Sequence, residues 1–185
     1  MKYFLLFISI LLFGCQPKED KPELDFVKIE IFPYLGGDPS NVYIDLKNKL
    51  LTFSSLQLLC VFEKECDESY EYQESEKPLD FVYINLNDGE MNILKSNFNN
   101  NFLNSIRENN QSLIDDPEKY EGIIFDGIIF EIDIVKENEI FSTDNYLILE
   151  RKDEVKIYEV LKIIKKHTDS EFNKKYIDNI SFYLE

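Results

Sequence analysis

The distribution of hydrophobic and polar residues along the chain predicts strands throughout its first half. Residues 26–32 alternate apolar and charged side chains, with Val27, Ile29 and Ile31 on one face, which is the pattern of a half-buried strand. Similar or shorter apolar runs predict further strands at 42–46, 50–54, 56–62 and 80–87. Residues 87–89, Asn-Asp-Gly, then suit either a tight turn or the start of a helix.

The second half mixes helical and strand patterns. Apolar residues at spacings of three and four predict a helix over about 97–109, closed by the polar segment 109–117. Residues 122–135 form the strongest strand pattern, with Glu131 and Asp133 on the face opposite its isoleucines. The remaining expectations are a strand at 146–149, a helix at 153–166, helical turns over 172–180 and a final strand at 180–184.

These elements predict an α+β fold, with an antiparallel sheet and one or two helices packed on one face. A parallel βαβ arrangement is less favoured, because the predicted strands cluster before the first predicted helix. The length of 185 residues suits a single globular domain, which we place at 25–185.

Charge and composition narrow the classes of function. Acidic residues outnumber basic ones by 36 to 20, giving a net charge of −16, so we expect no nucleic acid partner. The chain has one His, three Cys and no Trp, so the usual metal and nucleophile chemistries lack side chains. We therefore predict no cofactor and no enzymatic activity.

The N-terminus carries a targeting pattern. Lys2 precedes an apolar run over 3–13 that is too short to span a bilayer and fits the apolar region of a secretory signal. The run ends Leu12-Phe13-Gly14-Cys15, which resembles the lipobox of bacterial lipoproteins. The resemblance implies cleavage after Gly14, lipid on Cys15 and attachment to a membrane through that lipid.

The segment after Cys15 extends this resemblance. Residues 15–24 read as a tether, and its Lys18-Glu19-Asp20 resembles the surface-export signal of Bacteroidota lipoproteins. That implies an outer-membrane location, lipid-anchored and at the cell surface, with the periplasmic face as the alternative. Lys174-Lys175-Tyr176-Ile177 and Phe125-Asp126-Gly127 resemble segments of small lipoproteins of that phylum, a resemblance that implies no activity.

An acidic segment, residues 63–76, is the main candidate for binding a partner. It is half acidic, and it suits either contact with a basic protein or cation, or a solvated loop. The candidate contact residues are Glu63, Glu65, Asp67, Glu68, Tyr70, Glu71, Tyr72, Glu74 and Glu76.

The remaining candidates are two cysteines, one histidine and one carboxylate pair. Cys60 and Cys66 suit a disulfide beyond the inner membrane, or else two unrelated thiols. His167 reads as a surface residue at a helix end. Glu131 and Asp133 are the carboxylates that a hydrolase would use, although acidic pairs are expected by chance in so acidic a chain.

Three functions follow from these patterns. The first is a surface binding lipoprotein, in its sharpest form an inhibitor or immunity-type protein that neutralises a basic partner. The second is an accessory lipoprotein for envelope assembly or structure. The third and least favoured is a carboxylate-based hydrolase.

Overall fold

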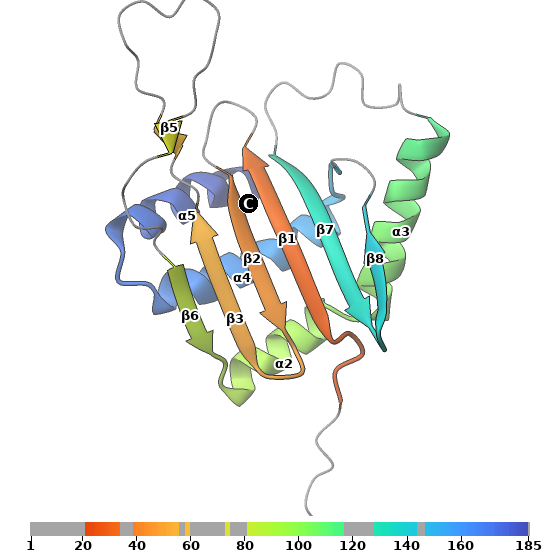
Figure 1. The fold of residues 1–185 in the computed structure, drawn as a ribbon, viewed down its shortest axis with the longest axis horizontal. Helices are drawn as coiled ribbons and strands as arrows, with labels where there is room; N and C mark the ends of the chain where they lie inside the picture. Colours follow the sequence, from red (N-terminus) through yellow and green to blue (C-terminus); the bar gives the residue numbers. More distant parts are fainter. Residues whose placement is uncertain are drawn as a thin grey trace, which may run out of the picture.

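A six-stranded antiparallel sheet forms the framework of the protein (Figure 1). The structure is a computed structural model that describes residues 21–33, 39–55, 58–59, 73–74, 81–116, 128–143 and 147–184. The strands lie in the order β6-β3-β2-β1-β7-β8. Their bounds are β1 Phe26–Pro33, β2 Ser40–Asp45, β3 Leu50–Ser55, β6 Phe81–Asn85, β7 Ile128–Lys136 and β8 Glu139–Ser142. A separate ladder pairs β4 (Leu58–Leu59) with β5 (Gln73–Glu74).

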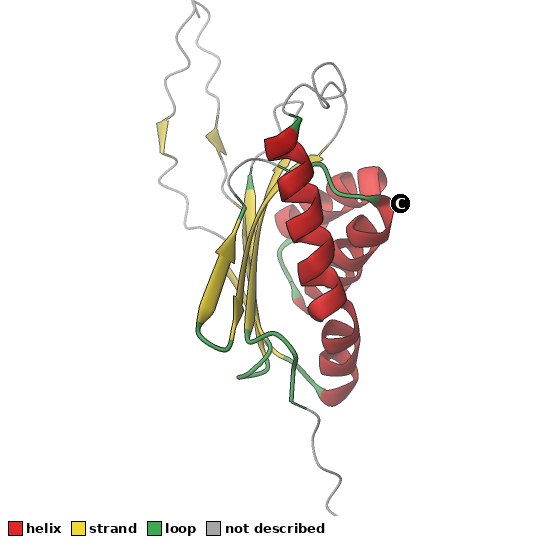
Figure 2. Cartoon of the chain, turned by 90° about the vertical axis from the view of Figure 1, so that its right-hand side faces the viewer, coloured by secondary structure: helices red, strands yellow, loops and turns green. Residues whose placement is uncertain are grey.

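The helices lie on one side of this sheet, as Figure 2 shows. Their bounds are α2 Asp88–Asn97, α3 Asn100–Asp115, α4 Arg151–His167 and α5 Glu171–Leu184. The α+β class and the antiparallel sheet are thus confirmed, with a more extensive helical layer than the one or two helices expected. None of the helices in the described part of the chain has the length and apolar character that crossing a bilayer requires.

Alternation along the strands decides which face the helices cover. Val27, Ile29 and Ile31 of β1 are fully buried, and the residues between them are not. The same period of two buries Ile132 and Ile134 of β7, so apolar side chains from neighbouring strands meet the helices in one core. All hydrophobic residues of that described core lie at Leu24 or later in the chain.

Two asparagines set where two helices begin: the helix expected at 97–109 is present as α3, and a further helix, α2, precedes it. The Asn87 side chain accepts the N–H of Glu90, and the Glu90 carboxylate accepts the N–H of Asn87, so a capping box starts α2. The Asn99 side chain accepts the N–H groups of Asn101 and Phe102, which starts α3. Asn97 therefore ends one helix, and the next begins at Asn100.

The polar segment at 109–117 does not close the helix where the sequence predicts. α3 continues to Asp115, because its asparagines have partners in the helical conformation. Asn109 donates from Nδ2 to the Ile148 carbonyl at 2.8 Å, and Asn110 is buried. Tertiary contacts thus outweigh the low helix propensity of asparagine.

The other differences from the sequence-based elements are local. The final strand predicted at 180–184 is wrong: Ile177, Ile180 and Leu184 are buried at helical spacing within α5. Residues 147–149 form only a bridge between Leu147 and Phe130, and β8 pairs with β7 instead. Only Leu58–Leu59 is described as strand within 56–62, and the part of 122–135 before Ile128 lies outside the described residues.

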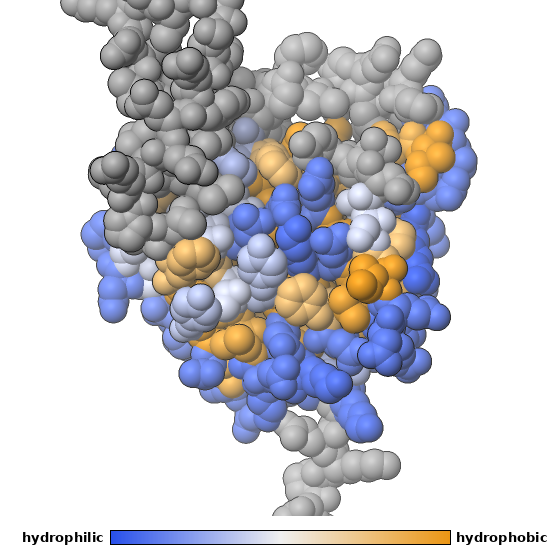
Figure 3. Space-filling model, viewed as in Figure 1, coloured by the Kyte–Doolittle hydropathy of each residue, from blue (hydrophilic) through white to orange (hydrophobic). Residues whose placement is uncertain are grey.

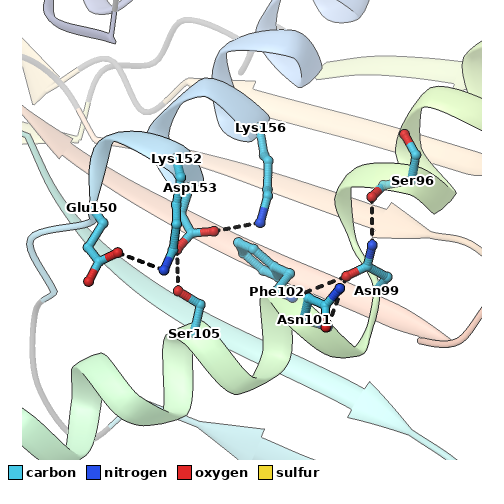
Figure 4. A network of polar contacts seen from close by, with 9 residues as sticks. All are labelled: Ser96, Asn99, Asn101, Phe102, Ser105, Glu150, Lys152, Asp153 and Lys156. Atoms are coloured by element: carbon cyan, nitrogen blue, oxygen red, sulfur yellow. Dashed lines mark hydrogen bonds and ion pairs between the residues drawn. The ribbon is translucent and has the colours of Figure 1, made fainter.

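A buried carboxylate joins α3 to α4 (Figure 4). Asp153 is only 2% exposed. It accepts a hydrogen bond from Ser105 Oγ of α3 at 2.6 Å and another from Lys156 Nζ at 2.6 Å. The Lys156 ammonium also lies 5.1 Å from the centre of the Phe102 ring. One carboxylate therefore neutralises a lysine that packs on an aromatic side chain of the neighbouring helix.

We expect Asp153→Asn to lower the free energy of unfolding by about 2–3 kcal/mol, because it leaves the Lys156 charge without its buried partner. Ser105→Ala should cost about 1 kcal/mol, the value of one hydrogen bond. The control is Glu159→Gln, which removes an exposed ion pair with Lys162 and should cost less than about 0.5 kcal/mol. Urea denaturation at neutral pH measures all three, and equal small losses would contradict a structural role for Asp153.

Candidate functional site

The sheet face opposite the helices is the most distinctive surface of the described protein. No described helix covers it, and Figure 3 shows it as a mosaic of apolar and polar side chains. We name it the open face and define it by the strand residues that alternate with the buried ones. They are Phe26, Lys28, Glu30, Asn41, Tyr43, Thr52, Phe81, Tyr83, Ile129, Glu131, Asp133, Val135 and Ile140.

Large apolar side chains on the open face remain in contact with solvent. Phe81 is 52% exposed, Tyr83 71% and Ile140 73%. Phe26 and Tyr43 lie between these edges, with their ring centres 6.2 Å apart. An uncovered antiparallel sheet face normally carries polar residues, so exposed aromatic and aliphatic residues at both of its edges indicate a surface for contact.

Four charged residues occupy the middle of the open face, and we call them the acidic cluster: Lys28 and Glu30 of β1, and Glu131 and Asp133 of β7. The strand register places Lys28 opposite Asp133 and Glu30 opposite Glu131. Lys28 forms ion pairs with both Glu30 and Asp133. Lys28 thus pairs with two of the three carboxylates, and the third, Glu131, lies directly opposite Glu30.

This arrangement shifts the pKa of the Glu131 carboxyl group. Burial raises the pKa of this group. The nearby charges of Glu30 and Asp133 and a hydrogen bond with Glu30 raise that pKa further, against the effect of Lys28. The ionised form of Glu131 is therefore under-stabilised in the protein as it stands. A cation brought by a binding partner would correct this imbalance.

His167 has a more specific setting than a surface residue at a helix end. Its Nε2 lies 2.8 Å from Oε1 of Glu90, and Lys166 Nζ donates to the same oxygen at 2.9 Å. The Glu90 side chain is only 7% exposed. This carboxylate therefore joins the start of α2 to the end of α4.

The same contacts set the pKa of Glu90. Burial alone would raise it, but the hydrogen bonds from His167, Lys166 and the Asn87 N–H together lower it to about 2. Because the folded-state pKa lies below the ordinary value of 4.5, the ionised carboxylate stabilises the folded protein above pH 4.5. That stability is lost as the pH falls from 4.5 to about 2.

Most of the sequence-derived site residues lie outside the described residues. They are Cys15, Cys60, Glu63, Glu65, Cys66, Asp67, Glu68, Tyr70, Glu71, Tyr72 and Glu76. Glu74 is described, and it pairs with Leu58 in the β4–β5 ladder. Glu131 and Asp133 share one face of β7, as predicted. Among the described residues, no group of three His, Cys, Asp or Glu side chains is placed to hold a metal ion.

Sequence reasoning missed the partners of Glu131. The alternation of β1 already shows Lys28 and Glu30 on its charged face. What it lacks is the pairing of β1 with β7, which brings together residues about a hundred positions apart and sets Glu30 against Glu131.

We expect Glu131→Gln to raise the free energy of unfolding at neutral pH by about 0.5 kcal/mol, because it removes like-charge repulsion across two strands. Glu108→Gln on the exposed side of α3 is the matched control and should leave stability unchanged. Urea denaturation measures both, and a loss of stability in Glu131→Gln would contradict the under-stabilised state of this carboxylate.

We expect Glu90→Gln to lower the free energy of unfolding near pH 6 by about 2–3 kcal/mol, because Lys166 and His167 lose their buried acceptor. The difference from the unaltered protein should shrink as the pH falls from 4.5 towards 2. Glu171→Gln, which removes an exposed pair with Lys174, is the control. A difference that stays constant across this pH range would exclude a lowered pKa for Glu90.

Comparison of the chain with protein-family models, with curated proteins and with solved structures finds no match.

Proposed function

We propose that this protein is a lipid-anchored binding module of the cell envelope that holds a basic protein partner on its open face. The observation that carries the proposal is the direct opposition of Glu30 and Glu131 in the middle of that face. Like charges opposite each other on neighbouring strands destabilise a sheet, and the fold does not need them there.

A cationic side chain would fit this position. An Arg or Lys inserted between Glu30 and Glu131 would neutralise both carboxylates and favour ionised Glu131. The exposed side chains of Tyr83, Phe81 and Ile140 would surround that contact with apolar surface. A buried charged anchor within an apolar and aromatic frame is a common arrangement in tight protein interfaces.

The open face is a second candidate acidic contact, besides the segment at 63–76. The role of that segment as a contact stays a prediction. An inhibitor or immunity-type protein is the sharpest form of the proposal, since a net charge of −16 would speed its encounter with a basic effector. The lipid anchor on Cys15 and the outer-membrane location, at the cell surface or on the periplasmic face, are part of the same proposal.

We expect Glu131→Lys and Tyr83→Ser each to weaken the captured partner's binding by at least about tenfold, because they alter the centre and the edge of the open face. The test immobilises the protein, captures basic proteins from lysate and neighbouring secretions, and measures the affinity of any purified partner for each variant. Glu108→Lys and Ile114→Ser, at exposed positions of α3, are the matched controls.

The pH dependence sharpens this test. Binding of a cation to ionised Glu131 should weaken as the pH falls through the raised pKa of that residue, because protonation removes the charge that the partner contacts. Glu131→Gln should bind less tightly and lose that part of the pH dependence. Equal affinity in the open-face variants and the controls would exclude the open face as the contact. Recovery of no basic partner by folded protein would favour the accessory role in envelope assembly.

A further inference from the structure

The end of the domain where the described chain begins lies at the bottom of Figure 1, and several lysines line a cavity there. This cavity of about 760 Å³ opens beside residues 21–25. Five of the chain's 20 basic residues line it: Lys21, Lys47, Lys49, Lys95 and Lys136. In a protein with a net charge of −16, this concentration of positive charge contrasts with the acidic cluster of the open face.

Two hairpin turns hold Lys47, Lys49 and Lys136 at this end. In the β2–β3 turn, Asp45 accepts the N–H of Lys47 at 3.1 Å, which fixes the turn backbone. In the β7–β8 hairpin, Lys136 donates from Nζ to Asn100 Oδ1 at 2.9 Å. Because both turns are continuous with the sheet, these lysines lose little backbone freedom when they bind a ligand.

Two of the three carboxylates of the cavity, those of Glu23 and Asp25, accept backbone N–H groups, and the third belongs to Glu137. Glu23 accepts the N–H of the first residue of α3 at 2.7 Å. Asp25 accepts the N–H of Glu137 at 2.8 Å. Lys49 Nζ lies 3.6 Å from Asp88, whose own side chain is 93% exposed, so that ion pair is weakened by solvent. The five lysines of the lining outnumber its three carboxylates, so the cavity carries an excess of positive charge.

The tether brings this cavity close to a membrane. Residues 15–21 cover six steps along the chain, which span at most about 20 Å when fully extended. An anchor at Cys15 would thus keep the lysine-lined end within about 20 Å of the headgroups, close enough for it to approach within the Debye length of roughly 8 Å over which an anionic bilayer attracts basic residues.

We propose that the lysine-lined cavity binds the phosphate groups of anionic phospholipids and so orients the domain on the membrane that anchors it. The sheet extends upward from this end in Figure 1, with its strands antiparallel, so the open face would stand upright on the bilayer and stay accessible from the side. This inference rests on the lipid anchor of the proposed function, but it does not depend on which partner the open face binds.

The test places the protein on vesicles and measures how fast each lysine reacts with an amine-modifying reagent. Residues 16–185 carry the whole described core, and an N-terminal hexahistidine tag on a nickel-chelating lipid replaces the natural anchor. One set of vesicles contains phosphatidylcholine, and the other has one part phosphatidylglycerol in three. We expect modification of Lys47, Lys49 and Lys136 to slow by about threefold or more on the anionic vesicles, and to recover near 1 M salt.

Lysines of α4 provide the internal control. Lys152 and Lys162 are more than half exposed and should react at the same rate on both kinds of vesicle. The double variant Lys47→Gln/Lys49→Gln should abolish the protection of Lys136. The matched double variant Lys152→Gln/Lys162→Gln should retain it, and circular dichroism checks that both variants are folded.

Two results would overturn the proposal. The first is an equal rate for Lys47, Lys49 and Lys136 on both kinds of vesicle. The second is the same protection on phosphatidylcholine vesicles when free glycerol phosphate is added, because this would assign the cavity to a soluble phosphate rather than to a membrane. Neither result bears on the open face, whose partner is tested separately.

Discussion

The period of two along the central strands is the constraint on which the rest of this structure depends. Val27, Ile29 and Ile31 must leave water together, and only the helical layer offers them an apolar surface. The same geometry sends Lys28 and Glu30 to the opposite side. A one-residue slip of β1 would exchange the two faces, so the core and the open face are fixed by one and the same register.

The helical layer needs its own positional constraints, because apolar packing alone tolerates sliding. Two buried carboxylates supply them. Glu90 fixes the start of α2 to the end of α4 through His167, and Asp153 fixes the start of α4 to α3 through Ser105. Each carboxylate lies in the first turn of its own helix, where the helix dipole favours a negative charge. The single histidine of the chain is thus used for structure.

Local sequence predicts what depends on neighbours in the chain. Periodicity predicts five of the strands, β1, β2, β3, β6 and β7, and helix α4. It also predicts the antiparallel sheet and the side of β7 that carries Glu131. Prediction from local sequence fails where contacts between distant parts of the chain determine the structure. Asn110 is helical because the fold buries it, residues 180–184 are helical because α5 needs an apolar face, and Glu131 meets Glu30 only through a pairing of distant strands.

The distribution of charge gives the two surfaces different roles. Glu30 lies opposite Glu131 in the middle of the sheet, and the unfavourable electrostatic energy of this pair is what our proposal of a cationic partner would relieve. The lysines at the other surface surround the point where the tether enters, so they would attract an anionic bilayer while the acidic residues are repelled by it. The anchor that we propose at Cys15 and the charge pattern would favour the same orientation. In that orientation the bilayer would contact the basic end, and the open face would remain accessible to a partner.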